Sequence, residues 1–298
     1  MTIRDMEIFA TVVACGTMSG AARKLHISQS SVSQVITEME REYRILLFER
    51  YGRSLRLTPT GETLLDYVQK TLRLLREIDR FLRSDPCESN LRIGASVTVG
   101  SYVLCPLLEQ FQRRCPCVRT EVLVANTHEI EEKLLSSELD IGLVEGVVTH
   151  PDLTVEEVMD DRLVLTCGRG HPFFGRAAVD LRELAGQPLI VREPGSGTRA
   201  QLEEALKQYK IPCDIRWVCN NTEAIQDAVA HNFGVSVLSP PIVREPCRQG
   251  ALWSCQIAGA DLRRKFSLVY HKNKYMFEAI TQFQHICLAF GRTDGACC

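Results

Sequence analysis

Apolar positions recur at helical spacing through the first part of the chain. The first such positions are Ile3, Met6, Phe9, Ala10 and Val13. The spacing predicts an amphipathic helix that ends at Gly16 and Thr17. Ser19 is expected to cap a second, short helix that carries Ala21, Ala22 and Leu25. After a tight connection at 27–28, Ser28 is expected to cap a third helix.

The third predicted helix has two contrasting faces. Its apolar stripe consists of Val32, Val35, Ile36, Met39 and Tyr43. The opposite face, at about 100° per residue, carries Ser30, Ser33, Gln34, Thr37 and Arg41. Three helices with such a short second link match the helix-turn-helix arrangement, in which the last helix lies in the major groove of DNA.

Short polar side chains near the start of a helix can reach base edges and phosphates. The candidate DNA contacts of this kind are Gln29, Ser30, Ser31, Ser33, Gln34 and Thr37. The alternative is that they are merely solvated positions on an amphipathic helix. Periodicity alone leaves both interpretations open.

Residues 47–57 favour the DNA-binding interpretation. Residues 47–50 and 55–57 read as two strands joined by a turn at 51–54, with Leu55 and Leu57 facing inward. Arg53 stands at the tip of this wing, where it can enter a minor groove or contact a phosphate. The alternative for Arg53 is a solvated turn arginine.

A long helix is predicted from Pro59 to about Leu82, with Thr58 as its cap. Its apolar positions, at near-heptad spacing, are Leu65, Val68, Leu72, Leu75, Ile78 and Leu82. One small domain is not expected to bury a seam of this length. We therefore predict a coiled coil between two copies of the chain. Packing against the second domain is the alternative.

Beyond residue 90, short apolar strands alternate with helices. Strands are predicted at 91–95, 122–125 and 141–145, and a helix capped by Thr127 runs to about Leu135. Such alternation indicates parallel α/β units. The segment that begins at Asn126 is echoed by the one that begins at Asn221, since both continue as Asn-Thr, a helix and an apolar strand. Two similar lobes that face one another are predicted, as in a hinged binding module.

Ligands of open α/β sheets bind beyond the carboxyl ends of the strands. One wall of the predicted site consists of Ser96, Thr98, Val99 and Gly100, and the other of Gly195, Ser196, Gly197 and Thr198. Both stretches precede helices, whose free N–H groups favour anions. Neither contains a carboxylate, so a small anion is the expected ligand. The alternative is an ordinary turn and helix cap.

Composition limits the class of protein. With 298 residues, of which 45% are hydrophobic and 24% charged, the chain has room for about two globular domains. A net charge of −2 argues against a protein that coats nucleic acid, although four arginines cluster between positions 44 and 56. No apolar run suggests a membrane span, and no signal peptide is expected. Thirteen cysteines then indicate reduced thiols and a cytoplasmic location.

Enzyme, cofactor and metal signatures do not fit. The segment Gly195-Ser196-Gly197 lacks nucleophile-elbow spacing, and neither a phosphate-binding loop nor a dinucleotide fingerprint is present. The cysteines lack the paired spacing of a zinc site. We therefore expect no catalysis, no cofactor and no metal. Cys213 and Cys219 as a redox switch are less favoured than scattered reduced thiols.

The run SGAARKLHISQSSVSQVITEMEREYRILLFERYGRSLRLTPTGETLL resembles the N-terminal domain of LysR-type transcriptional regulators. The later runs SELDIGLVEG and REPGSGTR also resemble that family, so the similarity covers essentially the whole chain. Two departures stand out. Tyr43-Arg44 replaces the family's usual Leu-Gly, which removes the glycine terminator of the third helix, and Ser137 replaces a common glycine.

The resemblance implies an α/β fold class with an N-terminal all-α winged helix-turn-helix and a two-lobed effector domain like that of periplasmic binding proteins. The predicted domains are 1–58 for DNA binding, 59–89 for the linker and dimerisation helix, and 90–298 for the effector. Lobe one would be 90–162 plus 268–298, and lobe two 163–267.

The implied function is transcriptional regulation in response to a small, anionic metabolite. Family members are commonly dimers of dimers on promoter DNA, so the resemblance implies double-stranded DNA, an effector, and a homodimer or homotetramer as partners, and no membrane. The rival is a solute-binding or catalytic α/β protein whose N-terminal helices serve only for oligomerisation.

Overall fold

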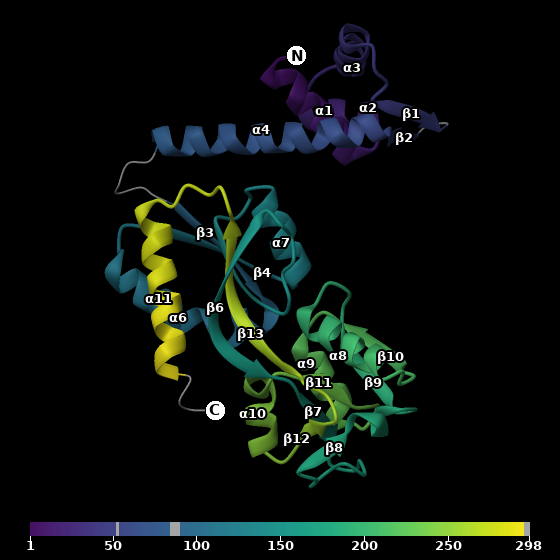
Figure 1. Cartoon of the computed structure of the whole chain (residues 1–298), viewed down its shortest axis with the longest axis vertical. Helices are drawn as coiled ribbons and strands as arrows, with labels where there is room; N and C mark the ends of the chain where they lie inside the picture. The colour runs from purple at the N-terminus through teal and green to yellow at the C-terminus, as the bar shows by residue number, and fades with distance from the viewer. Residues whose placement is uncertain (52–53, 84–89, 295–298) are drawn as a thin grey trace. The chain divides into compact units, whose positions relative to one another are not determined.

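The structure is a computed structural model that describes residues 1–51, 54–83 and 90–294. The chain folds as two compact units, Met1–Ser84 and Asp85–Cys298. The elements of the first unit are α1 (Ile3–Cys15), α2 (Met18–Leu25), α3 (Gln29–Tyr43), β1 (Phe48–Tyr51), β2 (Ser54–Leu57) and α4 (Pro59–Arg83) (Figure 1). The predicted three helices, wing and long helix are therefore all present.

Helix ends in the first unit follow the capping residues. Gly16 ends α1 in the left-handed conformation, at φ 67°. Thr17 then caps α2, because its backbone is extended and its Oγ1 accepts a hydrogen bond from Gly20 N at 3.1 Å. The prediction that Ser19 is this cap is wrong, since Ser19 already lies inside the helix. Ser28 caps α3 as predicted, and Thr58 Oγ1 accepts from Gly61 N at the start of α4.

The core of the first unit lies among α1, α2 and α3. Its buried members are Ile8, Phe9, Val12, Ala21, Ala22, Val32, Ile36, Met39, Leu47 and Val68. The rings of Phe9 and Phe48 lie 5.6 Å apart. Leu55 and Leu57 pack against this core, which confirms the predicted inward face of the wing.

Tyr43 does not belong to the buried stripe of α3. Its side chain is 48% exposed, and its hydroxyl accepts a hydrogen bond from the N-terminal amine of Met1. The prediction that placed it with Val32 and Ile36 is wrong because α3 ends at this residue, beyond the core that α1 and α2 provide.

The apolar seam of α4 divides into two halves. Leu65, Val68 and Leu72 pack against the core of the first unit, so its N-terminal half is used within the winged domain itself. That half fits neither a coiled coil nor packing against the second domain. Further along, Ile78 is 47% exposed and Leu82 is 74% exposed.

The second unit contains two lobes, each with its own sheet. Its strands are β3 (Asn90–Ser96), β4 (Arg119–Ala125), β5 (Ile141–Glu145), β6 (Leu153–Arg162), β7 (Val164–Gly168), β8 (Ala178–Asp180), β9 (Pro188–Arg192), β10 (Asp214–Cys219), β11 (Ser236–Leu238), β12 (Leu252–Ala258) and β13 (Arg263–His271). Its helices are α5 (Val97–Tyr102), α6 (Leu104–Arg114), α7 (Thr127–Leu135), the 3-10 helix η1 (Leu181–Leu184), α8 (Gly197–Gln208), α9 (Thr222–Ala230), α10 (Pro240–Arg248) and α11 (Glu278–Asp294).

The first lobe is built on a five-stranded sheet of order β4-β3-β5-β13-β6. In this sheet β3 runs parallel to β4 and β5, as predicted, and β13 runs antiparallel to β5 and β6. The second lobe contains a four-stranded sheet of order β11-β7-β12-β8 and the parallel pair β10-β9. Strands β6 and β13 pair along their whole length: β6 leads from the first lobe to the second, and β13 leads back (Figure 1).

The internal echo is a structural repeat. Both α7 and α9 are nine-residue helices capped by an asparagine, and each cap oxygen accepts a bond from the backbone N–H three residues later. The distances are 3.0 Å for Asn126 and 2.8 Å for Asn221. The prediction that Thr127 caps α7 is therefore wrong by one residue. Its hydroxyl instead donates to the Glu145 carbonyl oxygen at 2.9 Å.

The two positions where the family's glycine is missing keep a glycine-like backbone. Arg44 ends α3 at φ 54°, and Ser137 adopts φ 57° after α7. L-residues other than glycine pay a steric cost in this left-handed region. Helix α3 therefore ends where a glycine terminator would end it, at some local cost.

Candidate DNA-binding and effector sites

The first turn of α3 presents a cluster of hydroxyl groups. Ser28 Oγ accepts a hydrogen bond from Ser31 N at 3.0 Å and lies 2.8 Å from Ser30 Oγ and 2.7 Å from Ser31 Oγ. The side chains of Ser30 and Ser31 are exposed. Because a hydroxyl rotates to suit its partner, these groups can turn from one another to an acceptor or donor on DNA.

The rest of the predicted DNA-contacting face lies along the same side of α3. Gln29, Gln34 and Thr37 are exposed, whereas Ser33 is half-buried. Gln34 Nε2 donates to Glu38 Oε1 at 2.9 Å, so a paired contact to a base requires Gln34 to release that carboxylate. The remaining predicted contact, Arg53, lies outside the described residues.

Two basic residues beside α3 were not part of the sequence prediction. Arg23 and Lys24 occupy the last turn of α2, and both are exposed. In helix-turn-helix proteins the helix before the recognition helix crosses the DNA backbone, so these cations are candidate phosphate contacts. Their signal in the sequence is a basic pair just before the turn at 26–28.

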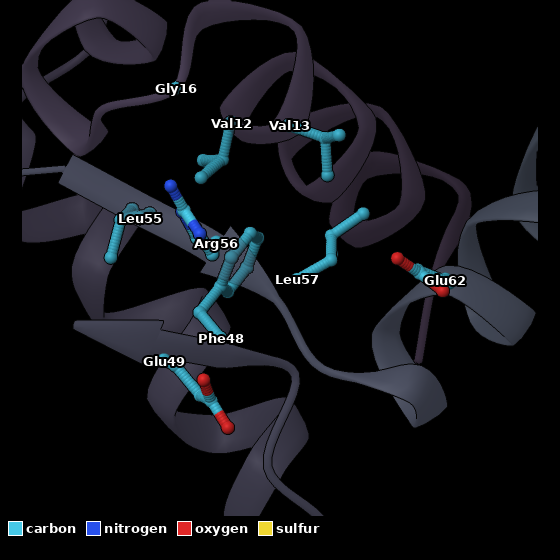
Figure 2. Close-up of a pocket in the computed structure, with 9 residues that line it drawn as sticks. All are labelled: Val12, Val13, Gly16, Phe48, Glu49, Leu55, Arg56, Leu57 and Glu62. Carbon is cyan, nitrogen blue, oxygen red and sulfur yellow. The ribbon is translucent and has the colours of Figure 1, made fainter. Parts of the chain in front are cut away.

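The first unit also has a hollow of about 530 Å³ between α1 and the wing (Figure 2). Its lining residues are Val12, Val13, Gly16, Phe48, Glu49, Leu55, Arg56, Leu57 and Glu62. Glu49 and Arg56 face each other across the two strands of the wing. None of the predicted DNA contacts that the structure describes lines this hollow, so it is separate from the predicted DNA-contacting turn of α3.

The first predicted effector wall follows β3. Ser96 caps α5 and Thr98 lies in its first turn, and both are fully buried. Val99 belongs to the core of the first lobe. A Cβ added at Gly100 would lie 2.8 Å from Val124 Cγ1, so this glycine allows α5 to approach β4. On this wall the hydroxyls of Ser96 and Thr98 are the groups available for chemistry.

The second predicted wall precedes α8. Gly195 has φ 89°, Ser196 is the N-cap, and Gly197 and Thr198 form the first helical turn. Ser196 makes no side-chain capping bond, and its buried Oγ has no partner among the described residues. Thr198 is 2% exposed.

The second wall lies against the first lobe at α7 and at the end of β5. His128 N donates to the Gly195 carbonyl oxygen at 3.2 Å. A Cβ added at Gly197 would lie only 2.3 Å from the Glu145 carbonyl oxygen. The glycine in this loop is therefore required for the close approach of the lobes. We call the region where Ser96, Thr98 and the Ser196–Thr198 segment meet the interlobe site.

A carboxylate lies inside the interlobe site. Glu145 ends β5, is 1% exposed, and accepts hydrogen bonds from the hydroxyls of Ser96 and Thr98, the latter at 3.1 Å. Glu145 was not among the predicted site residues, because it lies in neither of the two predicted loops. A carboxylate at the carboxyl end of a predicted strand was the available signal, since that edge of the sheet is where ligands bind.

Two buried arginines complete the site. Arg264 Nη1 donates to Thr198 Oγ1 at 2.9 Å, and its Nε donates to Asp161 Oδ2 at 2.6 Å. Arg192 donates twice to Glu193, at 2.8 and 2.9 Å. Arg264 Nη2 and Arg192 Nη1 are buried and have no partner among the described residues. Each arginine thus keeps one donor unused.

Burial and the neighbouring charges have opposite effects on the ionisation of Glu145. Burial raises the pKa of the Glu145 carboxyl, while the guanidinium groups of Arg264 and Arg192 and the Thr98 hydrogen bond favour its ionised form. Asp161 and Glu193 neutralise the two arginines. When Glu145 is ionised, the cluster of five charged groups therefore has a net charge of −1.

Within residues 1–51, 54–83 and 90–294, no group of three or more His, Cys, Asp or Glu side chains is arranged to hold a metal ion. No helix in those ranges has both the length and the apolar character needed to span a bilayer. Cys213 and Cys219 are both free thiols.

Both units match family descriptions. Residues 3–62 match "Bacterial regulatory helix-turn-helix protein, lysR family" and residues 86–291 match "LysR substrate binding domain". The chain is 30% identical to the uncharacterized HTH-type transcriptional regulator YeiE of Escherichia coli K12 over 287 residues, which cover 96% of this chain and 97% of YeiE. It is also 30% identical to the HTH-type transcriptional regulator CysL of Bacillus subtilis over 280 residues, covering 91% and 94% of the two chains.

Solved structures show the same fold. A full-length variant of OxyR from Pseudomonas aeruginosa has a TM-score of 0.66 at 24% identity, covering 96% of this chain and 94% of OxyR. The regulatory domain of Synechocystis CcmR, in complex with 2-PG, has a TM-score of 0.64 at 23% identity and covers 69% of this chain and 98% of that domain. With a winged helix-turn-helix followed by a two-lobed effector-binding domain, the chain belongs to the LysR family of DNA-binding transcriptional regulators.

Proposed function

We propose that this regulator reads double-stranded promoter DNA through α3 and responds to a small anion held in the interlobe site. The observation that carries the DNA-reading half is the exposed face of α3, on which hydroxyl and amide side chains predominate. Gln29, Ser30 and Thr37 lie there with short donors and acceptors in reach of base edges. Arg53 at the tip of the wing is proposed to add a phosphate or minor-groove contact.

Retention of the full-length chain on a fragment of its own promoter tests this proposal. The promoter fragment should be retained at salt concentrations that release a scrambled fragment of the same composition. Scrambling the sequence removes the specific base contacts but keeps the phosphate contacts, so the scrambled fragment binds more weakly. Equal retention of the two fragments would contradict base reading. It would favour the rival in which the N-terminal helices serve only for oligomerisation.

The effector half rests on the donors that converge between the lobes. Ser196 Oγ, Arg192 Nη1 and Arg264 Nη2 are buried and find no partner in the described part of the chain, and buried donors of this kind are costly unless something accepts from them. The N-terminus of α8 adds partial positive charge beside Thr198. CcmR with 2-PG and the effector-binding domain of QuiR with shikimate are similar in fold and hold small molecules.

Glu145 opposes an anion at this site unless its carboxyl is protonated. Ionised, it leaves the cluster with a charge of −1; protonated, it brings the cluster to neutrality and can itself donate a hydrogen bond. We therefore propose that the anion binds together with a proton on Glu145. Calorimetry on the full chain with sulfate, nitrate, acetate, ammonium and glycerol tests the class of ligand, and selective binding of the two non-anionic probes would refute it.

Self-association is proposed through the second half of α4. Leu74, Ile78 and Leu82 are 57%, 47% and 74% exposed, so this part of the helix has apolar surface that a second copy can bury. Leu82→Glu should give smaller particles in light scattering, whereas Gln69→Glu, at an exposed position on the opposite face of the same helix, should not. An unchanged mass of the Leu82 variant would contradict a homodimer through α4, and with it the proposed homotetramer.

The proposed domain division keeps 1–58 as the winged domain, 59–89 as the linker and 90–298 as the effector domain. Within the latter, lobe one comprises 90–162 plus 268–298 and lobe two 163–267. Strand β13 pairs with β6 from Arg263 onward, so the return to the first sheet begins before position 268. A cytoplasmic location is part of the proposal, because the regulator must share a compartment with its DNA.

A further inference from the structure

The two lobes are joined by two adjacent stretches of chain. Strand β6 ends at Arg162 and β7 begins at Val164, while β13 begins at Arg263 after the chain leaves β12. Leu163 N donates to the Leu262 carbonyl oxygen at 3.1 Å, so the two crossings are bonded to each other. Any rotation of one lobe against the other must bend the backbone at this junction.

A buried ion pair lies at the junction. Arg264 of β13 and Asp161 of β6 are direct cross-strand partners, and their side chains are 3% and 5% exposed. Arg264 Nε donates to Asp161 Oδ2 at 2.6 Å, and the guanidinium lies 5.6 Å from the centre of the Phe266 ring. The pair is thus fixed by its own strands and shielded from water.

Each member of the pair also bonds to a helix of the second lobe. Arg264 Nη1 donates to Thr198 Oγ1 in the first turn of α8, at 2.9 Å. Asp161 Oδ1 accepts from the hydroxyl of Ser239, the N-cap of α10, at 2.8 Å. Ser239 is fully buried. We call these four residues the junction network.

We propose that Arg264 is a positioning residue that fixes the angle between the lobes and holds Thr198 at the interlobe site. The inference rests on the proposed effector function of that site. The planar guanidinium has donors that point in fixed directions, so one side chain can bond Asp161 and Thr198 together. Lysine, whose ammonium is a point charge on a flexible stem, cannot reproduce both bonds in that geometry.

The network also has a way to respond to a ligand. Arg264 Nη2 is buried and has no partner among the described residues. A ligand acceptor that bonds to Arg264 Nη2 would pull on the same rigid guanidinium that Thr198 and Asp161 orient. Occupation of the interlobe site is thereby linked to the N-termini of both α8 and α10.

Hydrogen exchange on the full-length chain, without ligand or DNA, tests the proposal. Arg264→Lys should speed amide exchange about tenfold in the first turns of both α8 and α10, the size expected for the loss of one hydrogen bond. Thr198→Val should do so in α8 alone, and Ser239→Ala in α10 alone. Arg263→Lys is the matched control, because the exposed Arg263 side chain bonds to Asp261, and the bond that its carbonyl oxygen accepts from Gln201 of α8 does not depend on the side chain.

A merely structural role for Arg264 predicts a different result. Exchange would then rise throughout both lobes, including α7, and that outcome or an unchanged pattern would overturn the proposal. If Arg264→Lys does not fold, the double variant Thr198→Val with Ser239→Ala keeps the ion pair and must show both local increases. Because no ligand or DNA is used, failure here is distinguishable from failure of the proposed regulatory function.

Discussion

The candidate DNA-contacting turn of α3 keeps its polar side chains exposed, whereas the interlobe site buries nearly all of its own. Ser30 and Gln34 are exposed and lie within two turns of one helix. Ser96, Glu145 and Arg264, in contrast, are each less than 9% exposed and come from three separate strands or strand ends. The polar groups of the first site are exposed and available to a partner, whereas those of the second form a packed cluster whose charged groups already contact one another.

This difference determines what controls each site. On α3, an exposed hydroxyl can replace its hydrogen bond to Ser28 or to water with one to DNA at little cost in free energy. The affinity for DNA therefore depends on which contacts the DNA offers. In the interlobe site, a ligand must be accommodated among groups whose protonation states and hydrogen bonds are coupled. Binding between the lobes should therefore depend strongly on pH, while binding by α3 should depend mainly on sequence and salt.

The largest expected effect is the pH dependence of anion binding. Burial raises the pKa of the Glu145 carboxyl, and protonation below that pKa removes the negative charge that repels an anion. Sulfate affinity should therefore rise as pH falls, by up to about tenfold per pH unit above the pKa of Glu145. Calorimetry on the full chain from about pH 5 to 8 measures this.

The variant Glu145→Gln should bind sulfate with little dependence on pH. Glu131→Gln is the matched control, because burial raises the pKa of the Glu131 carboxyl too but it makes no contact recorded in the interlobe site. An affinity in the Glu145 variant that still follows pH would show that another group binds the proton.

A smaller effect is expected from the hydroxyls on the two walls. Thr98→Ala and Ser196→Ala should each weaken anion binding about ten- to a hundredfold, the loss expected for one hydrogen bond to a charged ligand. DNA binding without effector should remain, because both residues lie in the second unit. Ser101→Ala, also on α5 but exposed, is the control and should change neither quantity. Loss of DNA binding in either site variant would indicate that the effector domain unfolds.

The two sites also differ in how well they could be predicted from the sequence, because one is formed by residues of a single helix and the other by residues far apart in the chain. The wing, the helices of the first unit and the cap at Ser28 were predicted because each depends on residues close together in the chain. The misplaced caps at Ser19 and Thr127 were each within two residues of the true cap, since threonine, serine and asparagine all favour that position. Tyr43 was misjudged because periodicity does not show where the core ends.

The interlobe site was predicted only in part. The hydroxyl loops could be identified from the glycines and serines that precede helices, and the structure brings them together. The charges could not, because Arg264 reaches Thr198 only after β13 has returned to the first sheet, 66 residues further along the chain. Glu145 is nearer in sequence, but its contact with Ser96 depends on β3 and β5 being neighbours.

The next expected effect concerns base reading by α3. Ser33→Ala and Gln34→Ala should each weaken operator binding by roughly 1–3 kcal/mol if they contact base edges. Thr63→Ala, which removes an exposed hydroxyl from α4, is the control. Competition binding with operator and scrambled DNA separates lost base contacts from lost phosphate contacts. Unchanged operator affinity in the Ser33 and Gln34 double variant would contradict the assignment.

The smallest expected effect lies at the left-handed residues Arg44 and Ser137. Glycine at position 44 should relieve about 1–2 kcal/mol of steric cost and lose about 0.5–1 kcal/mol through the greater freedom of the unfolded chain. Arg44 is exposed, so little else changes, and Arg44→Gly should stabilise the first unit by roughly 0–1.5 kcal/mol in denaturant unfolding. Ser137 is 2% exposed, and Arg92 Nη2 donates to its carbonyl oxygen at 2.6 Å. Ser137→Gly opens space in that packed turn, so its gain should be smaller than that of Arg44→Gly. A larger gain in stability from Ser137→Gly would show that the cost of the left-handed backbone outweighs packing even at a buried residue.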